Sequence, residues 1–190
     1  MTDSRPRNLD PRERRWLLRL ARSTIAAKLE GRPLPDTPPG PGPLSDQRGA
    51  FVTLEIDSQL RGCIGHVSGT EALWLSVRSN AVNAAFRDPR FPPVEPAELA
   101  SLEIEISALS PLWPVSTPDE IEIGRDGLVI ERGHHRGLLL PQVADRYGWS
   151  AVEFLDQTCR KAGMQPGCWR DPETLISAFS AEVFSEDETG

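Results

Sequence analysis

The feature that most constrains the fold is a pair of alternating segments near the middle of the chain. Apolar and polar residues alternate over 50–57, and a second extended segment covers 60–67 after a short connection at Ser58 and Gln59. Alternation with a period of two is typical of a strand with one buried face. A connection this short joins antiparallel neighbours. The sequence therefore predicts a β-hairpin over 50–67.

A cysteine lies between two glycines on the second arm of this hairpin, in the run Leu60-Arg61-Gly62-Cys63-Ile64-Gly65-His66. Glycines beside a reactive residue type indicate that something approaches the backbone closely. In an extended strand Arg61 and Cys63 share a face, and a nearby cation favours the thiolate. His66 points the other way unless Gly65 bends the strand.

Two interpretations of this thiol stay open. Cys63 is either a catalytic nucleophile, with Arg61 and His66 as its candidate catalytic neighbours, or a small residue packed between glycines. Spacing alone does not support a sequential Cys-His pair, and a C-x-x-H zinc half-site has no second half in the chain. We therefore predict no metal site and no cofactor, because the common cofactor motifs are also absent from the sequence.

The segment after the hairpin predicts a buried helix that starts with a capping box at 68–71 and runs to about Arg87. It is apolar almost all round, except for a narrow polar stripe at helical spacing formed by Ser76, Asn80, Asn83 and Arg87. Polar side chains on a buried helix need partners. The stripe either bonds to neighbouring backbone or lines a wet cleft.

A candidate binding cleft combines this stripe with the hairpin and with a rigid loop. The loop is Asp88-Pro89-Arg90-Phe91-Pro92-Pro93, in which three prolines fix the path of the chain. The residues that we expect to line the cleft are Gly62, Ile64, Gly65, Asn80, Asn83, Arg87, Asp88, Arg90 and Phe91.

The other elements predict an α+β class with a mainly antiparallel sheet flanked by helices and a smaller second lobe. No βαβ rhythm is visible. We expect helices at about 11–30, 141–147 and 151–163, a strand at 102–108, a hairpin at 128–140 and a closing strand at 175–184. The expected organisation is a flexible N-terminus over 1–11, a single domain over 12–185 that includes a proline-rich loop at 32–48, and an acidic tail at 186–190.

Composition narrows the classes of function. The net charge is −7, which argues against nucleic acid as the main partner. No apolar run is long enough to span a bilayer, and the polar N-terminus is unlike a signal peptide. Three cysteines without a C-x-x-C pair predict reduced thiols in a cytoplasmic protein, with Cys159 and Cys168 filling core or loop space.

Four blocks that occur in order resemble the AMMECR domain family, in particular its bacterial members called AmmeMemoRadiSam system protein A. The blocks are Leu60-Arg61-Gly62-Cys63-Ile64-Gly65, Asp88-Pro89-Arg90-Phe91-Pro92-Pro93, Leu140-Pro141-Gln142-Val143-Ala144 with Gly148-Trp149, and Cys159-Arg160-Lys161-Ala162-Gly163. The resemblance covers about 17–184. It implies a larger antiparallel-sheet lobe with flanking helices, a smaller lobe, and association with a Memo-type protein and a radical S-adenosylmethionine protein. It implies no particular activity.

Three functions are suggested as hypotheses. The first is a cytoplasmic component of a multi-protein system that contains those two partners, with a small-molecule ligand as a possible addition. The second is a cysteine-dependent enzyme that acts on a small molecule through Cys63, with Arg61 or Arg90 stabilising an anion and His66 as base. The third is an interaction module without chemistry at Cys63.

Overall fold

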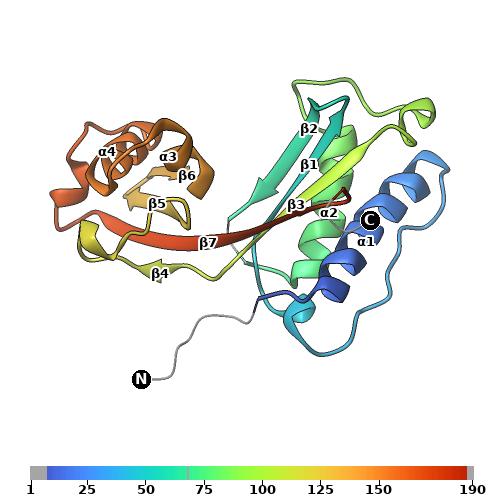
Figure 1. Cartoon of the computed structure of the whole chain (residues 1–190), viewed down its shortest axis with the longest axis horizontal. Helices are drawn as coiled ribbons and strands as arrows, with labels where there is room; N and C mark the ends of the chain where they lie inside the picture. Colours follow the sequence, from blue (N-terminus) through green and yellow to red (C-terminus); the bar gives the residue numbers. More distant parts are fainter. Residues whose placement is uncertain (1–7, 68, 188–190) are drawn as a thin grey trace. The chain divides into compact units, whose positions relative to one another are not determined.

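The structure is a computed structural model that describes residues 8–67 and 69–187. It divides into two compact units. Unit 1 comprises the residues up to Pro111 together with those from Glu182 onward, and unit 2 comprises Leu112–Ala181. Figure 1 labels the helices and strands of each unit.

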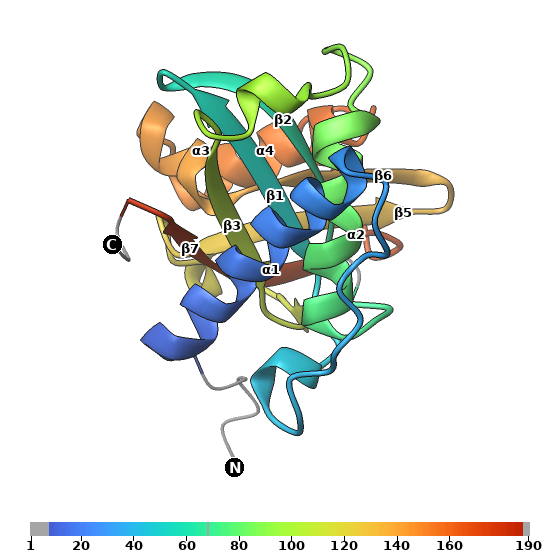
Figure 2. The ribbon, with the colours of Figure 1, turned by 90° about the vertical axis from the view of Figure 1, so that its right-hand side faces the viewer.

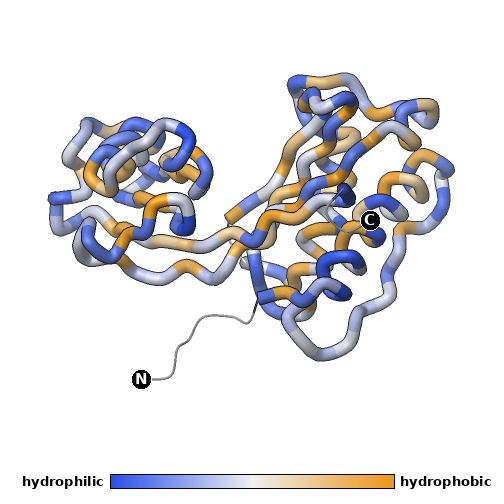
Figure 3. Tube along the Cα trace, in the orientation of Figure 1, coloured by the Kyte–Doolittle hydropathy of each residue, from blue (hydrophilic) through white to orange (hydrophobic). Residues whose placement is uncertain are grey.

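The sheet of unit 1 is antiparallel and has β2 at its edge. The strand order is β2-β1-β3 and then the end of β7. The bounds are Ala50–Ile56 for β1, Gln59–His66 for β2, Glu103–Leu109 for β3 and Leu175–Ser185 for β7. Because β1 pairs with β2 along its whole length, the predicted hairpin is confirmed. Val52 and Leu54 of β1 have no exposed surface, and hydrophobic and hydrophilic residues alternate along the strands of this unit (Figure 3).

Two helices cover one face of this sheet, α1 (Pro11–Leu29) and α2 (Leu73–Phe86) (Figure 2). The predicted start of α1 is confirmed. Asp10 accepts the backbone N–H of Glu13, and the Glu13 carboxylate accepts the N–H of Asp10, which together form a capping box. Both helices share one hydrophobic core with the strands of unit 1.

The start of α2 differs from the prediction. Ser68 lies outside the described residues, and the helix begins at Leu73 without a side-chain cap. The preceding residue, Ala72, is extended and forms a β-bridge with Gln47, while the N–H of Leu73 donates to the carbonyl of Asp46. Tertiary pairing with the proline-rich loop therefore sets this helix end, so the local sequence signal was misleading.

The described ends of the chain are packed more firmly than we expected. Leu9 is buried, and its N–H donates to the Glu182 carboxylate at 2.9 Å. At the other end, the Arg22 guanidinium donates to Glu186 at 2.6 Å. The remainder of the expected flexible N-terminus and acidic tail, residues 1–7 and 188–190, lies outside the described residues.

Unit 2 pairs the β5/β6 hairpin and the short β4 with β7, and places two helices with them. The bounds are Trp113–Pro114 for β4, Asp126–Arg132 for β5, His135–Leu139 for β6, Pro141–Tyr147 for α3 and Ala151–Lys161 for α4. A separate core cluster holds this unit together. The predicted α+β class, with an antiparallel sheet and flanking helices, is confirmed.

The described residues also contain four 3₁₀ turns, at Pro43–Ser45 (η1), Pro96–Glu98 (η2), Pro118–Glu120 (η3) and Cys168–Arg170 (η4). Two of them hold residues with partners elsewhere in the fold. The turn η2 carries an ion-pair partner of Arg61, and η4 carries Cys168, which is bonded to α4.

Candidate functional site around Cys63

The glycine before the cysteine lets β2 press directly against α2. A Cβ atom added to Gly62 would lie 2.2 Å from the carbonyl oxygen of Ala84 in α2. No real Cβ makes a contact this close, so only glycine fits at this position. Gly62 therefore faces the helix layer, and because side chains alternate along a strand, Cys63 faces the opposite side of the sheet.

The Cys63 thiol lies beside Thr53 of the neighbouring strand. The two residues pair across β1 and β2, and the Thr53 hydroxyl donates to Cys63 Sγ at 3.2 Å. Cys63 is half-buried. On the other side of Thr53, β3 contributes Glu105 to the same row. The sulfur thus sits in a polar cross-strand row and takes no part in the core beneath α2.

The rigid loop binds both backbone groups of Cys63. Its N–H donates to Asp88 Oδ2 at 2.9 Å, and its carbonyl accepts from Arg90 Nη2 at 3.1 Å. Edge strands expose unpaired N–H and C=O groups, which favour pairing with other chains. The loop formed by the second sequence block therefore pairs with the backbone N–H and C=O of Cys63, which β2 would otherwise leave open at the sheet edge. We refer to this arrangement of Asp88, Arg90 and the Cys63 backbone as the edge clamp.

The charged pair within the edge clamp is tightly bound. The Asp88 side chain is 1% exposed and accepts from Arg90 Nη2 at 2.7 Å, from Arg90 Nε at 2.9 Å and from the Arg90 backbone N–H at 3.1 Å. The Arg90 side-chain bonds, followed by those from the Cys63 and Arg90 backbone, hold the pKa of Asp88 well below its usual range despite its burial. The pKa of Arg90 is raised, chiefly by Asp88 and to a lesser extent by the Cys63 thiol.

The Arg61 side chain lies elsewhere than strand alternation predicts, and its catalytic role stays a prediction. The register between β1 and β2 shifts between Leu54, which pairs with Gly62, and Glu55, which pairs with Leu60. Arg61 is therefore the extra residue of a β-bulge, and a bulge redirects the side chain. Its guanidinium pairs with Glu98 at 2.7 Å and donates to the Pro92 carbonyl at 2.9 Å.

The guanidinium beside Cys63 is consequently that of Arg90. The hydrogen bond with Glu98 is the main cause that raises the pKa of Arg61, and the same bond lowers the pKa of Glu98. Arg61 fastens the rigid loop from the bulge, while Arg90 reaches the cysteine itself. The alternation that placed Arg61 next to the thiol does not hold at a bulge, and no local pattern in the sequence signals one.

His66 points away from Cys63, as regular alternation predicts. Its Nδ1 lies 3.5 Å from Asn80 Nδ2, and its Nε2 lies 3.9 Å from a carboxylate oxygen of Glu71. The structure therefore gives His66 partners on the α2 side of the sheet. A role for it as a base toward Cys63 has no support in this geometry.

The polar stripe of α2 is not brought to the thiol. Asn80 is buried and donates to the Ala50 carbonyl at 3.1 Å and to Ser76 at 3.3 Å, which matches the backbone-bonding interpretation. Farther along the stripe, Arg87, which follows the last residue of α2, donates to Asn83 Oδ1 at 3.4 Å. The stripe therefore lies on the side of the sheet that α2 covers, whereas the Cys63 thiol lies on the other side.

The remaining predicted lining residues pack against the core, the neighbouring strand or Arg90. Ile64 packs against the core of unit 1, and the Phe91 ring lies 5.5 Å from the Arg90 guanidinium carbon. Gly65 lies against Phe51, whose ring would be 2.4 Å from an added Cβ. These residues shape the strand and the loop, and their role in binding remains a prediction.

Over 8–67 and 69–187 no group of three or more His, Cys, Asp and Glu side chains is placed to hold a metal ion. In the same part of the chain, no helix has the length and hydropathy needed to cross a membrane.

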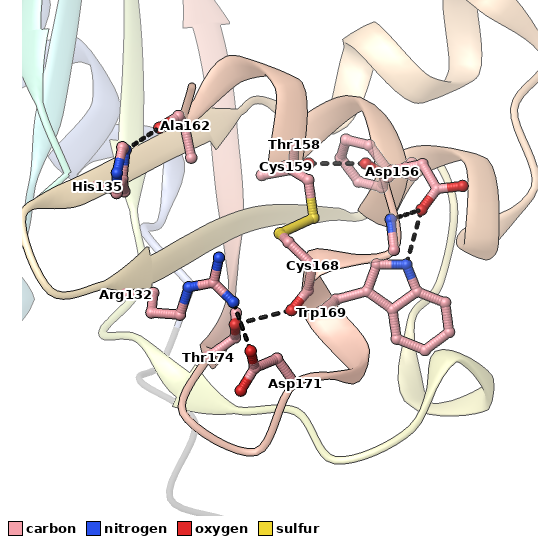
Figure 4. Close-up of a disulfide and its surroundings, with 12 residues drawn as sticks. Arg132, His135, Asp156, Thr158, Cys159, Ala162, Cys168, Trp169, Asp171 and Thr174 are labelled. Carbon is pink, nitrogen blue, oxygen red and sulfur yellow. Dashed lines mark hydrogen bonds and ion pairs between the residues drawn. A yellow bond between two sulfur atoms is a disulfide. The ribbon is translucent and has the colours of Figure 1, made fainter. Parts of the chain in front are cut away.

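The prediction that all three cysteines are reduced is wrong. Cys159 of α4 and Cys168 of η4 form a disulfide in unit 2, which leaves Cys63 as the free cysteine (Figure 4). The two partners are nine residues apart and follow no standard spacing. Only the turn after α4, which brings the chain back across the helix end, makes the pairing visible.

Comparison with known proteins extends over nearly the whole chain. The family model described as AMMECR1 matches residues 18–184. A protein from Methanothermobacter thermautotrophicus is 46% identical, with 92% of this chain and 95% of that protein covered, and one from Thermococcus gammatolerans is 45% identical, with 90% and 89% covered.

A solved structure also matches. The crystal structure of the uncharacterized protein PH0010 from Pyrococcus horikoshii superposes with a TM-score of 0.78 at 40% identity, with 90% of each chain covered. The blocks that form the edge clamp fall inside the matched region. The chain belongs to the AMMECR1 family.

Proposed function

We propose that this chain is a cytoplasmic component of a multi-protein system that also contains a Memo-type protein and a radical S-adenosylmethionine protein. In this proposal the sheet face around Cys63 is the surface that meets a partner or a small-molecule ligand. The resemblance of the ordered sequence blocks supplies the partners. The surface is argued from the edge clamp.

One observation supports the choice of this surface. Asp88 and Arg90 bind the backbone N–H and C=O of the same residue, Cys63, and leave its thiol half-exposed on the face that α2 does not cover. Functional groups are most precise when a rigid element holds them through their own supporting bonds. A buried carboxylate and an arginine committed to one strand position fit that design.

Anaerobic co-purification tests the proposed partnership. The tagged chain is co-expressed with the Memo-type and radical proteins, as wild type, as Cys63→Ser and as Gln59→Ser, an exposed change at the start of the same strand. We expect stable association for the wild type, loss of the system's cellular function with Cys63→Ser, and wild-type behaviour with Gln59→Ser. Failure of the wild type to associate, together with normal function of Cys63→Ser in cells, contradicts the proposal.

A second candidate function is a cysteine-dependent enzyme, and the surroundings of the sulfur favour it. The Thr53 hydroxyl donates to Sγ, and the Arg90 guanidinium binds the Cys63 carbonyl. A hydrogen-bond donor at the sulfur and a guanidinium at the same residue are groups that such an enzyme would use beside its nucleophile. In this version Cys63 is the nucleophile and Arg90, in place of Arg61, is the anion-stabilising residue.

Comparison of Cys63→Ala with Cys63→Ser distinguishes these functions from a pure interaction module. Neither Cys63→Ala nor Cys63→Ser can form a thiolate, so an enzyme loses its activity in both. An interaction module keeps full association and full cellular function with Cys63→Ala, because the small side chain preserves the surface. Full function of Cys63→Ala therefore excludes the enzyme.

A further inference from the structure

A pocket of about 480 Å³ lies inside unit 2, beside the disulfide. The end of the β5/β6 hairpin and the segment after α4 form it. Its lining residues are Arg132, His135, Gly163, Met164, Gln165, Pro166, Gly167, Cys168 and Asp171. Figure 4 shows Arg132 and His135 on one side of the disulfide and Asp156 and Trp169 on the other.

The two cysteines of the disulfide differ in exposure. Cys159 has no exposed surface and belongs to the hydrophobic core of unit 2. Cys168 is 7% exposed and is one of the pocket's lining residues, whereas Cys159 is not. Thiol–disulfide exchange requires that the attacking thiolate reach one sulfur along the S–S axis. Cys168 is the partner that borders the pocket, so it is the one that a thiolate in the pocket would meet first.

We propose that small thiols reach Cys168 through this pocket and undergo thiol–disulfide exchange there. In the same proposal, the redox state of the Cys159–Cys168 pair sets the shape of the pocket. The proposal is independent of the function proposed for Cys63. The reductant class is a low-molecular-weight thiol or dithiol.

The exchange balances as two displacements. An incoming thiolate bonds to Cys168 Sγ, the S–S bond breaks, and its electron pair goes to Cys159 Sγ, which takes a proton from water. A second thiolate then attacks the outer sulfur of the mixed disulfide and releases the Cys168 thiolate, which is protonated in turn. The protein gains two electrons and two protons, and two external thiols become one external disulfide.

An ion pair lies among the residues that line the pocket. Arg132 lines it with a side chain that is 33% exposed, and one of its guanidinium nitrogens pairs with Asp171 at 2.6 Å. His135 is held in place because its Nδ1 donates to the Ala162 carbonyl at 3.2 Å. Attack occurs through the thiolate form. Because Asp171 balances the charge of Arg132, the pocket presents a neutral ion pair, and the proposed approach to Cys168 rests on access alone.

Reduction should alter the pocket without unfolding the unit. Asp156 Oδ1 accepts the Gly167 N–H at 2.7 Å and the Trp169 Nε1–H at 2.8 Å, and the Thr174 hydroxyl donates to the Cys168 carbonyl at 2.7 Å. These bonds keep η4 attached when the S–S bond is open. The change is therefore confined to Gly163–Gly167, the wall of the pocket, whose first and last residues have positive φ.

Three measurements test the proposal, each in a Cys63→Ser background so that only this pair reports. In the first, the disulfide-bonded protein is treated briefly with glutathione under native conditions and quenched with acid, and peptide mass spectrometry locates the mixed disulfide. We expect it on Cys168. An adduct on Cys159, or no reduction of the folded protein by glutathione or dithiothreitol, overturns the proposal.

The second measurement compares matched single variants. Cys159→Ser leaves the Cys168 thiol at the pocket, and Cys168→Ser leaves the Cys159 thiol in the core. Because reactivity follows access, iodoacetamide should label the Cys159→Ser protein about tenfold faster or more. Equal rates, or the reverse order, contradict entry through the pocket.

The control of pocket shape has its own readout. The amides of Gly163 and Met164, which donate to the carbonyls of Arg160 and Cys159, should exchange faster on reduction, while the Gly167 amide, β5 and β7 keep their protection. Unchanged exchange of the Gly163 and Met164 amides overturns redox control of the pocket, even where the chemistry at Cys168 proceeds.

Discussion

Unit 1 and unit 2 hold their cysteines in opposite ways. In unit 1, the edge clamp binds the backbone of Cys63 and leaves the sulfur uncommitted to any covalent bond. In unit 2, the sulfurs themselves form the link that joins α4 to η4. The contrast shows that a cysteine near glycines has no fixed meaning, because the surrounding bonds decide whether the thiol is presented or consumed.

The glycines of the two sites also differ in purpose. Gly62 has ordinary backbone geometry and is required because α2 leaves no room for a Cβ. Gly163 and Gly167 have φ values of +76° and +82°, which other residues rarely adopt. The first glycine allows a close approach of two elements, and the other two allow the chain to turn.

The largest effect that we predict is at Gly62. Gly62→Ala places a methyl group 2.2 Å from a backbone oxygen of α2, and the strand or the helix has to move. We expect a loss of about 2–4 kcal/mol in the free energy of unfolding. Urea denaturation followed by circular dichroism measures it. Cys63→Ala, one residue away on the other face, is the control, and an equal loss for both would refute the packing argument.

Removal of the disulfide should have the next largest effect. Replacement of both Cys159 and Cys168 by alanine opens a short loop, for which chain entropy predicts a loss of about 2–3 kcal/mol. Denaturation with and without dithiothreitol measures it. The variant should be insensitive to the reductant, whereas the wild type should lose stability in it. A wild type that is equally stable under both conditions would mean that hydrogen bonds alone hold η4.

A similar or smaller loss is expected from the edge clamp. Asp88→Asn removes the anionic partner of Arg90 and weakens the acceptor for the Cys63 N–H. Because Arg90 is about half exposed and water can partly replace the lost partner, we expect a loss of about 1–2 kcal/mol. Hydrogen exchange of the Cys63 amide should accelerate in the same variant. Unchanged protection of that amide would show that Asp88 does not hold the edge strand.

The acid dependence of this contribution has a definite sign. The pKa of Asp88 is lower in the folded protein than in the unfolded chain, so its ionised form stabilises the fold. The stability difference between wild type and Asp88→Asn should be constant above about pH 5, where Asp88 is ionised in both the folded protein and the unfolded chain. The difference should shrink as the pH falls below about 4, and it should go on shrinking down to the lowered pKa that Asp88 has in the folded protein. A difference that grows toward acid would contradict this sign.

The smallest predicted effect concerns the hydroxyl beside the thiol. Thr53→Val removes the donor to Cys63 Sγ and keeps the shape of the side chain. We expect a change in stability of under about 1 kcal/mol and a several-fold slower iodoacetamide reaction at neutral pH. Thr53→Ser, which keeps the donor, should react like the wild type. Equal rates for valine and serine would show that this hydrogen bond does not affect the thiol.

Elements with strong local signals could be predicted from the sequence. The period-two alternation of 50–57 and the capping residues Asp10 and Ser150 lead to β1, α1 and α4 as observed. The start of α2 could not be predicted in this way, because the bridge from Gln47 to Ala72 holds the preceding residues extended. Long-range pairing there outweighs a local capping pattern.

Residues of the site could be predicted from the sequence, but their arrangement in space could not. The first two of the four sequence blocks do meet, at Cys63, Asp88 and Arg90. The bulge at Arg61 and the burial of the Asn80 side chain depend on register and on the layer above the sheet, which no local pattern encodes. The disulfide was missed for the same reason, since its partners meet only after the turn that follows α4.

The most direct test of whether the edge clamp presents a reactive thiol is the iodoacetamide labelling rate of Cys63 in the native protein at neutral pH, compared with the urea-unfolded chain. The Cys159–Cys168 disulfide stays closed in both, so Cys63 is the reporting thiol. If the edge clamp presents the thiol for chemistry, the native rate equals or exceeds the unfolded rate. A native rate below the unfolded one would show that Cys63 is a packed residue, and would contradict a role for the edge clamp in presenting it.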